Sequence, residues 1–197
     1  MDNIILKTKK FFQERVKKYG EDRPGYPDPF GLLKHVEEVA KWADFLCDKN
    51  KDADREVVML SVWLHDVGHY PLPTKIDHAA RGQRLAKQFL SQEKYDSSKI
   101  QQVLHCVRSH RCKDIMPQTI EAKIIACADS ASHFTDSMYM DMAKDDKKAK
   151  VPLRVYGKIE RDYRDASIFP GVKKSLTPLY MAWKKLISEY EKIDLSK

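Results

Sequence analysis

The sequence predicts an all-α protein, and three observations lead to that prediction. Apolar residues recur at spacings of three and four through most of the 197 residues, which is the pattern of amphipathic helices. Residues that typically begin and end helices separate these segments. No alternating apolar–polar segment typical of strands and no internal repeat occurs. We therefore predict a bundle of helices that cross at irregular angles.

Three helices are expected in the first third of the chain, over residues 2–19, 30–48 and 54–68. The apolar stripe of the first fits a helix docked on a core, although a helix lying on a membrane surface has the same pattern. A proline-rich loop over 21–29 follows, in which Asp28 can cap the second helix with Pro29 in its first turn. Asp54 can cap the third helix, and Gly68 can end it.

Four more helices are expected, over residues 77–90, 95–111, 117–134 and 172–190. Asp77 can cap the first of these, and Pro117 opens the third. A charged break over residues 144–152 precedes the last helix. The inward face of that helix is predicted to consist of Leu176, Leu179, Tyr180, Trp183 and Leu186.

Length and composition predict a single soluble domain in the cytoplasm. A chain of 197 residues, 42% hydrophobic and 33% charged, can bury a sizeable core. Its apolar runs are far shorter than the ~20 residues of a membrane helix, and its first residues lack the apolar core of a secretory signal. The four cysteines form no CxxC pair, so we expect reduced thiols.

The net charge of +7 is divided between the two ends of the chain. Residues 1–20 carry six Lys or Arg and two Asp or Glu, and residues 144–197 carry fourteen and eight. The middle of the chain, residues 21–143, carries sixteen and nineteen and holds all seven histidines. Proteins that bind nucleic acid gather their basic groups on one face or helix. The division favours a solvated surface over a nucleic-acid footprint.

Five helical segments each place a His or an Asp in line with apolar neighbours. These residues are His35, His65 with Asp66, His78, His110 and Asp129. A buried carboxylate needs a cation or a strong hydrogen-bond network. Histidine nitrogens and carboxylate oxygens together suit Mn, Fe, Co, Ni or Zn. A single inward His is usually a hydrogen-bonded core residue, but His35, His65, Asp66 and Asp129 together form a set of four ligands.

Two other histidines need separate interpretation. The helical neighbours of His105 are polar, so we expect it not to bind metal. His133 lies one turn past Asp129. It either reaches the same pocket or has a structural role.

The order His35, His65-Asp66 and Asp129 resembles the HD superfamily of metal-dependent phosphohydrolases, with WLHDVGHY as the central motif. The segments DHAARGQRLAKQFL, VLHCVRSHR and EAKIIACADSASHF look like the later helices of small bacterial and archaeal members. The resemblance covers residues 30–135 and does not extend to the two ends of the chain. It implies one HD-type domain over 1–197, with the terminal helices 2–19 and 172–190 packed on the motif-bearing core.

The resemblance also implies a metal site and a phosphate side. One divalent metal would be bound by His35, His65, Asp66 and Asp129, and Mg is a further candidate for it. His78 and His110 would line the phosphate side or hold a second metal. The motif reads HDVGH, similar to the HDxGH triphosphohydrolase branch, whose members are much longer chains. The signatures of guanosine-tetraphosphate hydrolases and of small deoxynucleotidases are absent, so the substrate stays open.

The expected chemistry is hydrolysis of a phosphate ester or anhydride, of a nucleotide by preference, by metal-activated water. Asp66 could orient the water or accept its proton. His69 is a candidate general acid, or else a cation that interacts with the helix dipole. One or two cations near the site in sequence are expected to contact phosphate. The candidates are Lys75, Arg81, Arg108 and Arg111.

Two other functions stay open. The chain could be a non-catalytic sensor of nucleotides or metal, but the full ligand set and His69 favour an enzyme. It could also be a nucleic-acid-associated protein, against which the division of charge argues. We expect a small phosphorylated partner and no membrane. The terminal helices can close the bundle or pair with another subunit, so a homo-oligomer also fits.

Overall fold

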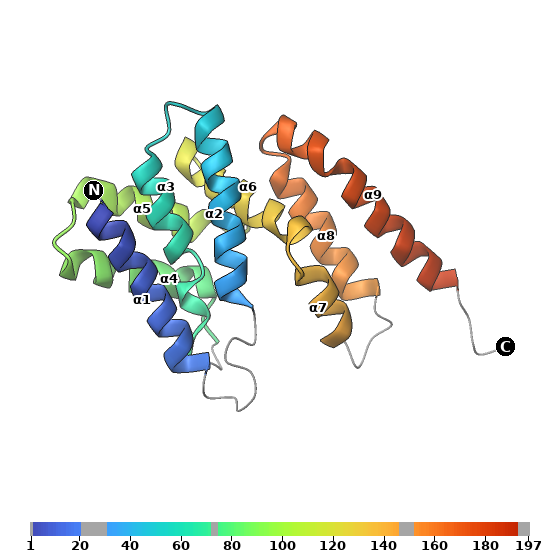
Figure 1. Ribbon diagram of the computed structural model, residues 1–197, viewed down its shortest axis with the longest axis horizontal. Coiled ribbons are helices and arrows are strands. Elements are labelled where there is room, and N and C mark those ends of the chain that lie inside the picture. Colours follow the sequence, from blue (N-terminus) through green and yellow to red (C-terminus); the bar gives the residue numbers. More distant parts are fainter. Residues whose placement is uncertain (1, 21–30, 72–74, 146–151, 193–197) are drawn as a thin grey trace. The chain divides into compact units, whose positions relative to one another are not determined.

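The computed structural model describes residues 2–20, 31–71, 75–145 and 152–192. Within these ranges the protein contains nine α-helices, one short 3-10 helix and no strand (Figure 1). This confirms the all-α prediction. The chain divides into two compact units, residues 1–129 and 130–197. A single domain over the whole chain therefore stays a prediction.

The N-terminal unit is organised around one buried helix. Its elements are α1 (Asp2–Gly20), α2 (Leu32–Lys49), α3 (Arg55–Leu64), η1 (Val67–His69), α4 (His78–Gln92), α5 (Ser97–Ser109) and the first part of α6 (Ile120–Thr135). Helix α3 packs against α1, α2 and α5, and α4 packs against α5 and η1. Seven of the ten residues of α3 are buried, as expected for a helix that is apolar on most of its surface.

The helix starts follow the capping aspartates. Asp54 accepts hydrogen bonds from the backbone N–H groups of Glu56 and Val57, and Asp77 accepts one from that of Ala79, as predicted. Such a cap stabilises a helix by about 1 kcal/mol.

The helix ends agree less well with the sequence analysis. Helix α3 ends at Leu64, and a tighter 3-10 turn replaces the continuous helix expected to Gly68. The predicted loop over 21–29 with its cap Asp28, and most of the break predicted over 144–152, lie outside the described residues.

Helix α1 docks on the core of the N-terminal unit. Phe12 and Val16 are buried, and the Phe12 ring lies 6.1 Å from that of Trp63 in α3. Phe11 stacks on Phe89 of α4 with ring centroids 4.4 Å apart. These contacts place the apolar stripe of α1 inside the protein. They support a helix docked on the core, the first of the two alternatives given for that stripe. Among the described residues, no helix has the length and apolar character needed to cross a membrane.

The C-terminal unit contains two helices that the sequence analysis missed. It consists of the end of α6, then α7 (Met138–Asp145), α8 (Pro152–Ala166) and α9 (Pro170–Lys192). Helix α8 packs against both α7 and α9. The buried face of α8 includes Val155, Ile159, Asp162 and Ala166. Seven of the fifteen residues of α8 are charged, so the segment offers few apolar residues from which a helix could be predicted.

The prediction for the inward face of α9 is partly wrong. Leu176 is buried as predicted, but Leu179 is 42% exposed and Leu186 is 47% exposed. Ile187, which was not predicted, is buried instead. Helix α8 covers a narrow stripe of α9, so the wide face predicted from five apolar residues is only partly used.

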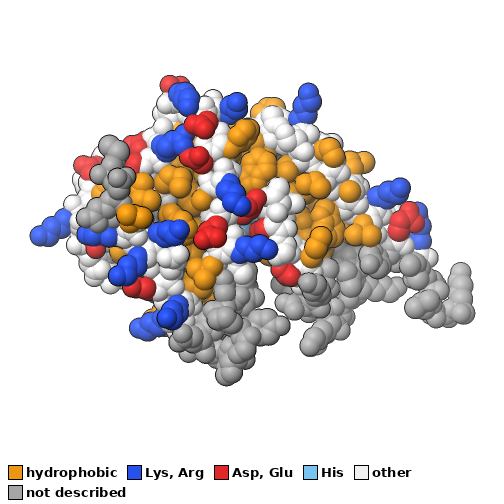
Figure 2. Space-filling model, in the orientation of Figure 1, with side chains coloured by type: hydrophobic (Ala, Val, Ile, Leu, Met, Phe, Trp, Pro, Cys, Tyr) orange, Lys and Arg blue, Asp and Glu red, His pale blue; other side chains and the backbone are white. Residues whose placement is uncertain are grey.

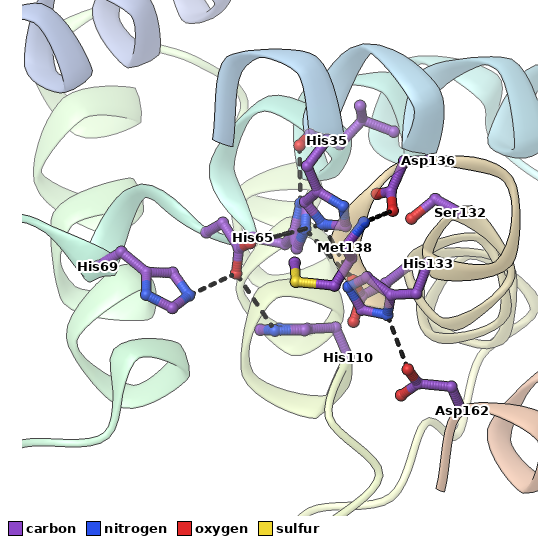
Figure 3. A network of polar contacts seen from close by, with 12 residues as sticks. His35, His65, His69, His110, Ser132, His133, Asp136, Met138 and Asp162 are labelled. Atoms are coloured by element: carbon purple, nitrogen blue, oxygen red, sulfur yellow. Dashed lines mark hydrogen bonds and ion pairs between the residues drawn. The ribbon is translucent and has the colours of Figure 1, made fainter. Parts of the chain in front are cut away.

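Asp162 is the centre of a buried polar network in the C-terminal unit. Its carboxylate accepts a 2.9 Å hydrogen bond from the Tyr139 hydroxyl and lies 3.0 Å from Lys158 Nζ. It also lies 3.1 Å from His133 Nδ1, a contact that Figure 3 shows. Burial alone would raise the pKa of Asp162, but His133 and Lys158 hold it below its ordinary value. Of the two roles considered for His133, these contacts support the structural one.

We expect Asp162→Asn to destabilise the C-terminal unit, because breaking a buried ion pair costs about 3–5 kcal/mol. The lowered pKa means that Asp162 stabilises the folded state above its unfolded pKa of about 3.9, and that this contribution is lost as the pH falls through the folded pKa. Urea unfolding at about pH 7 and about pH 3 should therefore show a large difference between variant and wild type that shrinks in acid.

Asp114→Asn is the matched control for this substitution. Asp114 is exposed and pairs with Arg108, and an ion pair that involves an exposed carboxylate contributes little to stability. Equal losses in the two variants, or a loss for Asp162→Asn that does not change with pH, would contradict the structural role of the network.

Candidate metal centre

The inward-facing histidines and aspartates of five segments meet at one place in the N-terminal unit. His35 lies on α2, His65 and Asp66 in the turn after α3, His78 at the start of α4, His110 directly after α5, and Asp129 on α6. His35, His65, Asp66 and His110 are buried. The structure thus brings together all six residues that the sequence analysis selected. Their roles as ligands stay a prediction.

Three of these residues form a first group around one oxygen of Asp66. His35 Nε2 lies 3.2 Å from Asp129 Oδ1 and 3.6 Å from Asp66 Oδ2. His65 Nε2 lies 3.5 Å from Asp66 Oδ2 and 3.9 Å from Asp129 Oδ1. Ligand atoms of His35, His65 and Asp129 all lie within 4.8 Å of one another, close enough to hold one metal ion.

The hydrogen bonding of His65 suits a metal ligand. Its Nδ1–H donates to the Val62 carbonyl at 2.8 Å, and because a carbonyl can only accept, the lone pair of the ring is on Nε2. Nε2 is fully buried and has no hydrogen-bond partner among the described residues. A divalent cation is the natural partner for an unprotonated ring nitrogen that faces two carboxylates. The residues present therefore fit a metal ion.

A second group surrounds the other oxygen of Asp66. Asp66 Oδ1 lies 3.3 Å from His69 Nε2, 3.4 Å from His78 Nε2 and 3.7 Å from His110 Nε2. Figure 3 shows dashed lines from His69 and His110 to this oxygen. The His69 ring stacks on that of His78 with centroids 4.0 Å apart. Ligand atoms of Asp66, His69 and His78 also lie within 4.8 Å of one another. Asp66 therefore lies between two groups of ligands, with one carboxylate oxygen facing each.

The second group contains a residue that the sequence analysis did not consider as a ligand. His69 was proposed only as a general acid or a helix-end cation. His69 follows Asp66 by three residues, and the tight turn η1 lies between and includes His69. This spacing is the signal that could have indicated that the two side chains lie close together.

Burial sets the protonation of the site. It lowers the pKa of His65 to about 4 and that of His78 to about 3, so both rings are neutral near pH 7. Burial alone would raise the pKa of Asp66, but His65 and His69 hold it well below its ordinary value. Neutral imidazole and ionised carboxylate are the forms that bind metal ions.

The arginines predicted to contact phosphate have partners within the protein. Arg81 Nη1 donates to the Pro71 carbonyl at 2.8 Å. Arg111 pairs with Asp77, and Arg108 pairs with Asp114. Lys75 is exposed. Phosphate binding by these four cations stays a prediction.

His105 lies outside both groups of ligands. Its Nε2 accepts a 3.0 Å hydrogen bond from the backbone N–H of Gln118. That His105 does not bind metal stays an expectation.

Two glycines allow the turn that carries Asp66 and His69 to lie directly on α4. A Cβ atom on Gly68 would lie 2.0 Å from the His78 carbonyl oxygen and 2.6 Å from the Gly82 nitrogen. A Cβ atom added to Gly82 would lie 3.3 Å from the His65 carbonyl oxygen. This close backbone contact brings Asp66 and His69 next to His78, so a side chain at Gly68 would separate the ligands.

We expect Gly68→Ala to destabilise the N-terminal unit by about 1–3 kcal/mol, the usual cost of overpacking. Gly157 in α8 has no atom within 4 Å of an added Cβ, so Gly157→Ala should stabilise its helix by about 0.5–1 kcal/mol. Denaturant unfolding of both variants checks this. A Gly68→Ala variant as stable as the wild type would contradict the close contact.

Comparison with protein families gives a match over the part of the chain that carries both groups of ligands. An HD domain model matches residues 32–132, more than half of the chain. No curated protein and no solved structure matches the chain. The matched range begins at the first residue of α2, contains both groups of ligands and excludes α1. The chain therefore belongs to the HD domain family.

Proposed function

We propose that this HD domain protein is a metal-dependent phosphohydrolase that acts on a phosphate ester or anhydride of a small molecule. The substrate class that we favour is nucleotides. The observation that carries the proposal is the buried carboxylate of Asp66, with one oxygen toward each group of histidines. The first group supports one divalent ion, and the second group supports another. Mn, Fe, Co, Ni and Zn suit this mixture of nitrogen and oxygen ligands.

The chemistry combines the ion with groups of the chain. When bound, a divalent ion polarises a phosphoryl oxygen and lowers the pKa of a water molecule. Asp66 orients the attacking water and accepts a proton at its carboxylate. His69 is 24% exposed at its side chain, unlike the fully buried His65. It is therefore placed to donate a proton to the leaving oxygen, with the second ion held by Asp66, His78 and His110 and not by His69.

A small substrate is supported by the surface and by the motif. On the face shown in Figure 2, lysine and arginine side chains are interspersed with acidic ones, whereas a nucleic-acid footprint needs basic groups clustered together. The resemblance of HDVGH to the triphosphohydrolase branch supports a nucleotide.

We expect His65→Ala to weaken binding of Mn²⁺ or Co²⁺ by at least about tenfold, because the variant loses a buried ligand. Calorimetric titration and the metal content after gel filtration measure this. His105→Ala removes a histidine outside the site and should bind the ions as the wild type does. Wild-type affinity in His65→Ala would contradict the proposed centre.

We expect the wild type to hydrolyse at least one of a panel of nucleoside mono-, di- and triphosphates in the presence of Mn²⁺, Co²⁺, Ni²⁺ or Mg²⁺. Asp66→Ala should reduce kcat by at least about 10³-fold, because it removes a group shared by both ligand groups. Product analysis by ion-exchange chromatography identifies the bond that breaks.

The His69→Gln variant tests the proposed acid in the same assays. Its kcat should fall by about 10²–10⁴-fold with a nucleotide and much less with a p-nitrophenyl ester, whose leaving oxygen needs no proton. A wild type that retains metal but turns over no substrate would contradict the enzyme and support a sensor.

A further inference from the structure

The turn that carries Asp66 and His69 is held by the guanidinium group of Arg15, a residue that precedes the residues matched by the HD domain model. Arg15 Nε donates to the Val67 carbonyl at 3.0 Å, and Arg15 Nη2 donates to the Tyr70 carbonyl at 2.6 Å. Arg15 lies on α1, which precedes the matched residues 32–132. The two carbonyls flank Gly68 and His69, so a single side chain spans the turn.

These contacts leave the turn fixed at two places. At Gly68 the backbone lies against α4, where an added Cβ would lie 2.0 Å from the His78 carbonyl oxygen. Arg15 holds the carbonyls of Val67 and Tyr70, two residues that are 2% exposed. Buried carbonyls need hydrogen-bond donors, and the planar guanidinium supplies two in fixed geometry.

A second arginine acts on the end of the same segment. Arg81 Nη1 donates to the Pro71 carbonyl at 2.8 Å. Burial lowers the pKa of Arg15, and the positive charge of Arg81 lowers it further. Because the positive charges of Arg15 and Arg81 repel each other, their approach to one short segment indicates that hydrogen bonds to its carbonyls hold both side chains in place.

We propose that Arg15 is a positioning residue of the metal centre. By holding the carbonyls of Val67 and Tyr70, it keeps Asp66 and His69 in their places in the second group, where Asp66 Oδ1 lies 3.3 Å from His69 Nε2. The kinetic part of this inference rests on the proposed phosphohydrolase function. The positional part does not depend on any activity.

Hydrogen exchange in the metal-free protein tests the positional part. The His69 N–H donates to the Asp66 carbonyl at 3.0 Å, so its exchange rate reports opening of the turn. In Arg15→Ala we expect this amide to exchange at least about tenfold faster. Lys9 lies on the same helix and stacks over Trp63. Lys9→Ala should therefore leave the exchange of His69 unchanged.

Two further variants and a ligand titration separate positioning from loss of α1. Arg15→Lys keeps the charge and the stem but offers one nitrogen, so it should show intermediate exchange. Calorimetric titration with Mn²⁺ should show weaker binding in Arg15→Ala than in Lys9→Ala. Unchanged exchange in Arg15→Ala, or the same increase in Lys9→Ala, would overturn the proposal.

Enzyme kinetics test the part of the Arg15 proposal that depends on the proposed phosphohydrolase function. We expect kcat of Arg15→Ala to fall by up to about 10²-fold, the effect of a misplacement of about 1 Å, with little change in KM. Added ethylguanidinium should restore part of the activity, and ethylammonium should not. If the wild type has no turnover, the proposed function fails, and hydrogen exchange still decides the role of Arg15. Equal kcat in Arg15→Ala and Lys9→Ala would overturn the kinetic part.

Discussion

The structure of the N-terminal unit depends on an ionised carboxylate that is removed from water. Asp66 is 6% exposed, and burying such a group without partners costs several kcal/mol. Its two oxygens are instead surrounded by histidines from α2, α4 and the turns after α3 and α5. Because these elements are far apart in sequence, the carboxylate has partners only when the whole unit is folded.

Backbone packing makes that arrangement possible. The turn at Gly68 lies on α4 without an intervening side chain, and Arg15 holds the opposite side of the turn through two carbonyls. The ligands are therefore fixed by main-chain contacts as well as by the apolar packing of α3. Helix α1 belongs to the same unit as residues 32–129 of the HD match. It adds the hydrogen bonds of Arg15, which lies outside the matched residues.

Much of the fold and the site could be predicted from the sequence because periodic apolar stripes and capping residues are local signals. Asp54 and Asp77 indicated helix starts, and the inward His and Asp residues indicated the place where helices meet. Helix α8 was missed because seven of its fifteen residues are charged, one of them the buried Asp162. The contact of Arg15 with two backbone carbonyls could not be predicted, since it depends on tertiary position and an arginine on a lysine-rich helix carries no such signal.

The protonation of the centre links metal binding to folding. Burial keeps His65 and His78 neutral near pH 7, the form in which a ring nitrogen can bind a cation. In the metal-free protein His65 Nε2 has no hydrogen-bond partner among the described residues. A divalent cation would be a partner for both the carboxylate of Asp66 and the lone pair of His65 Nε2. Since a ligand that binds only the folded state stabilises it by mass action, the same desolvation that makes the apo centre costly favours the metal-bound folded state.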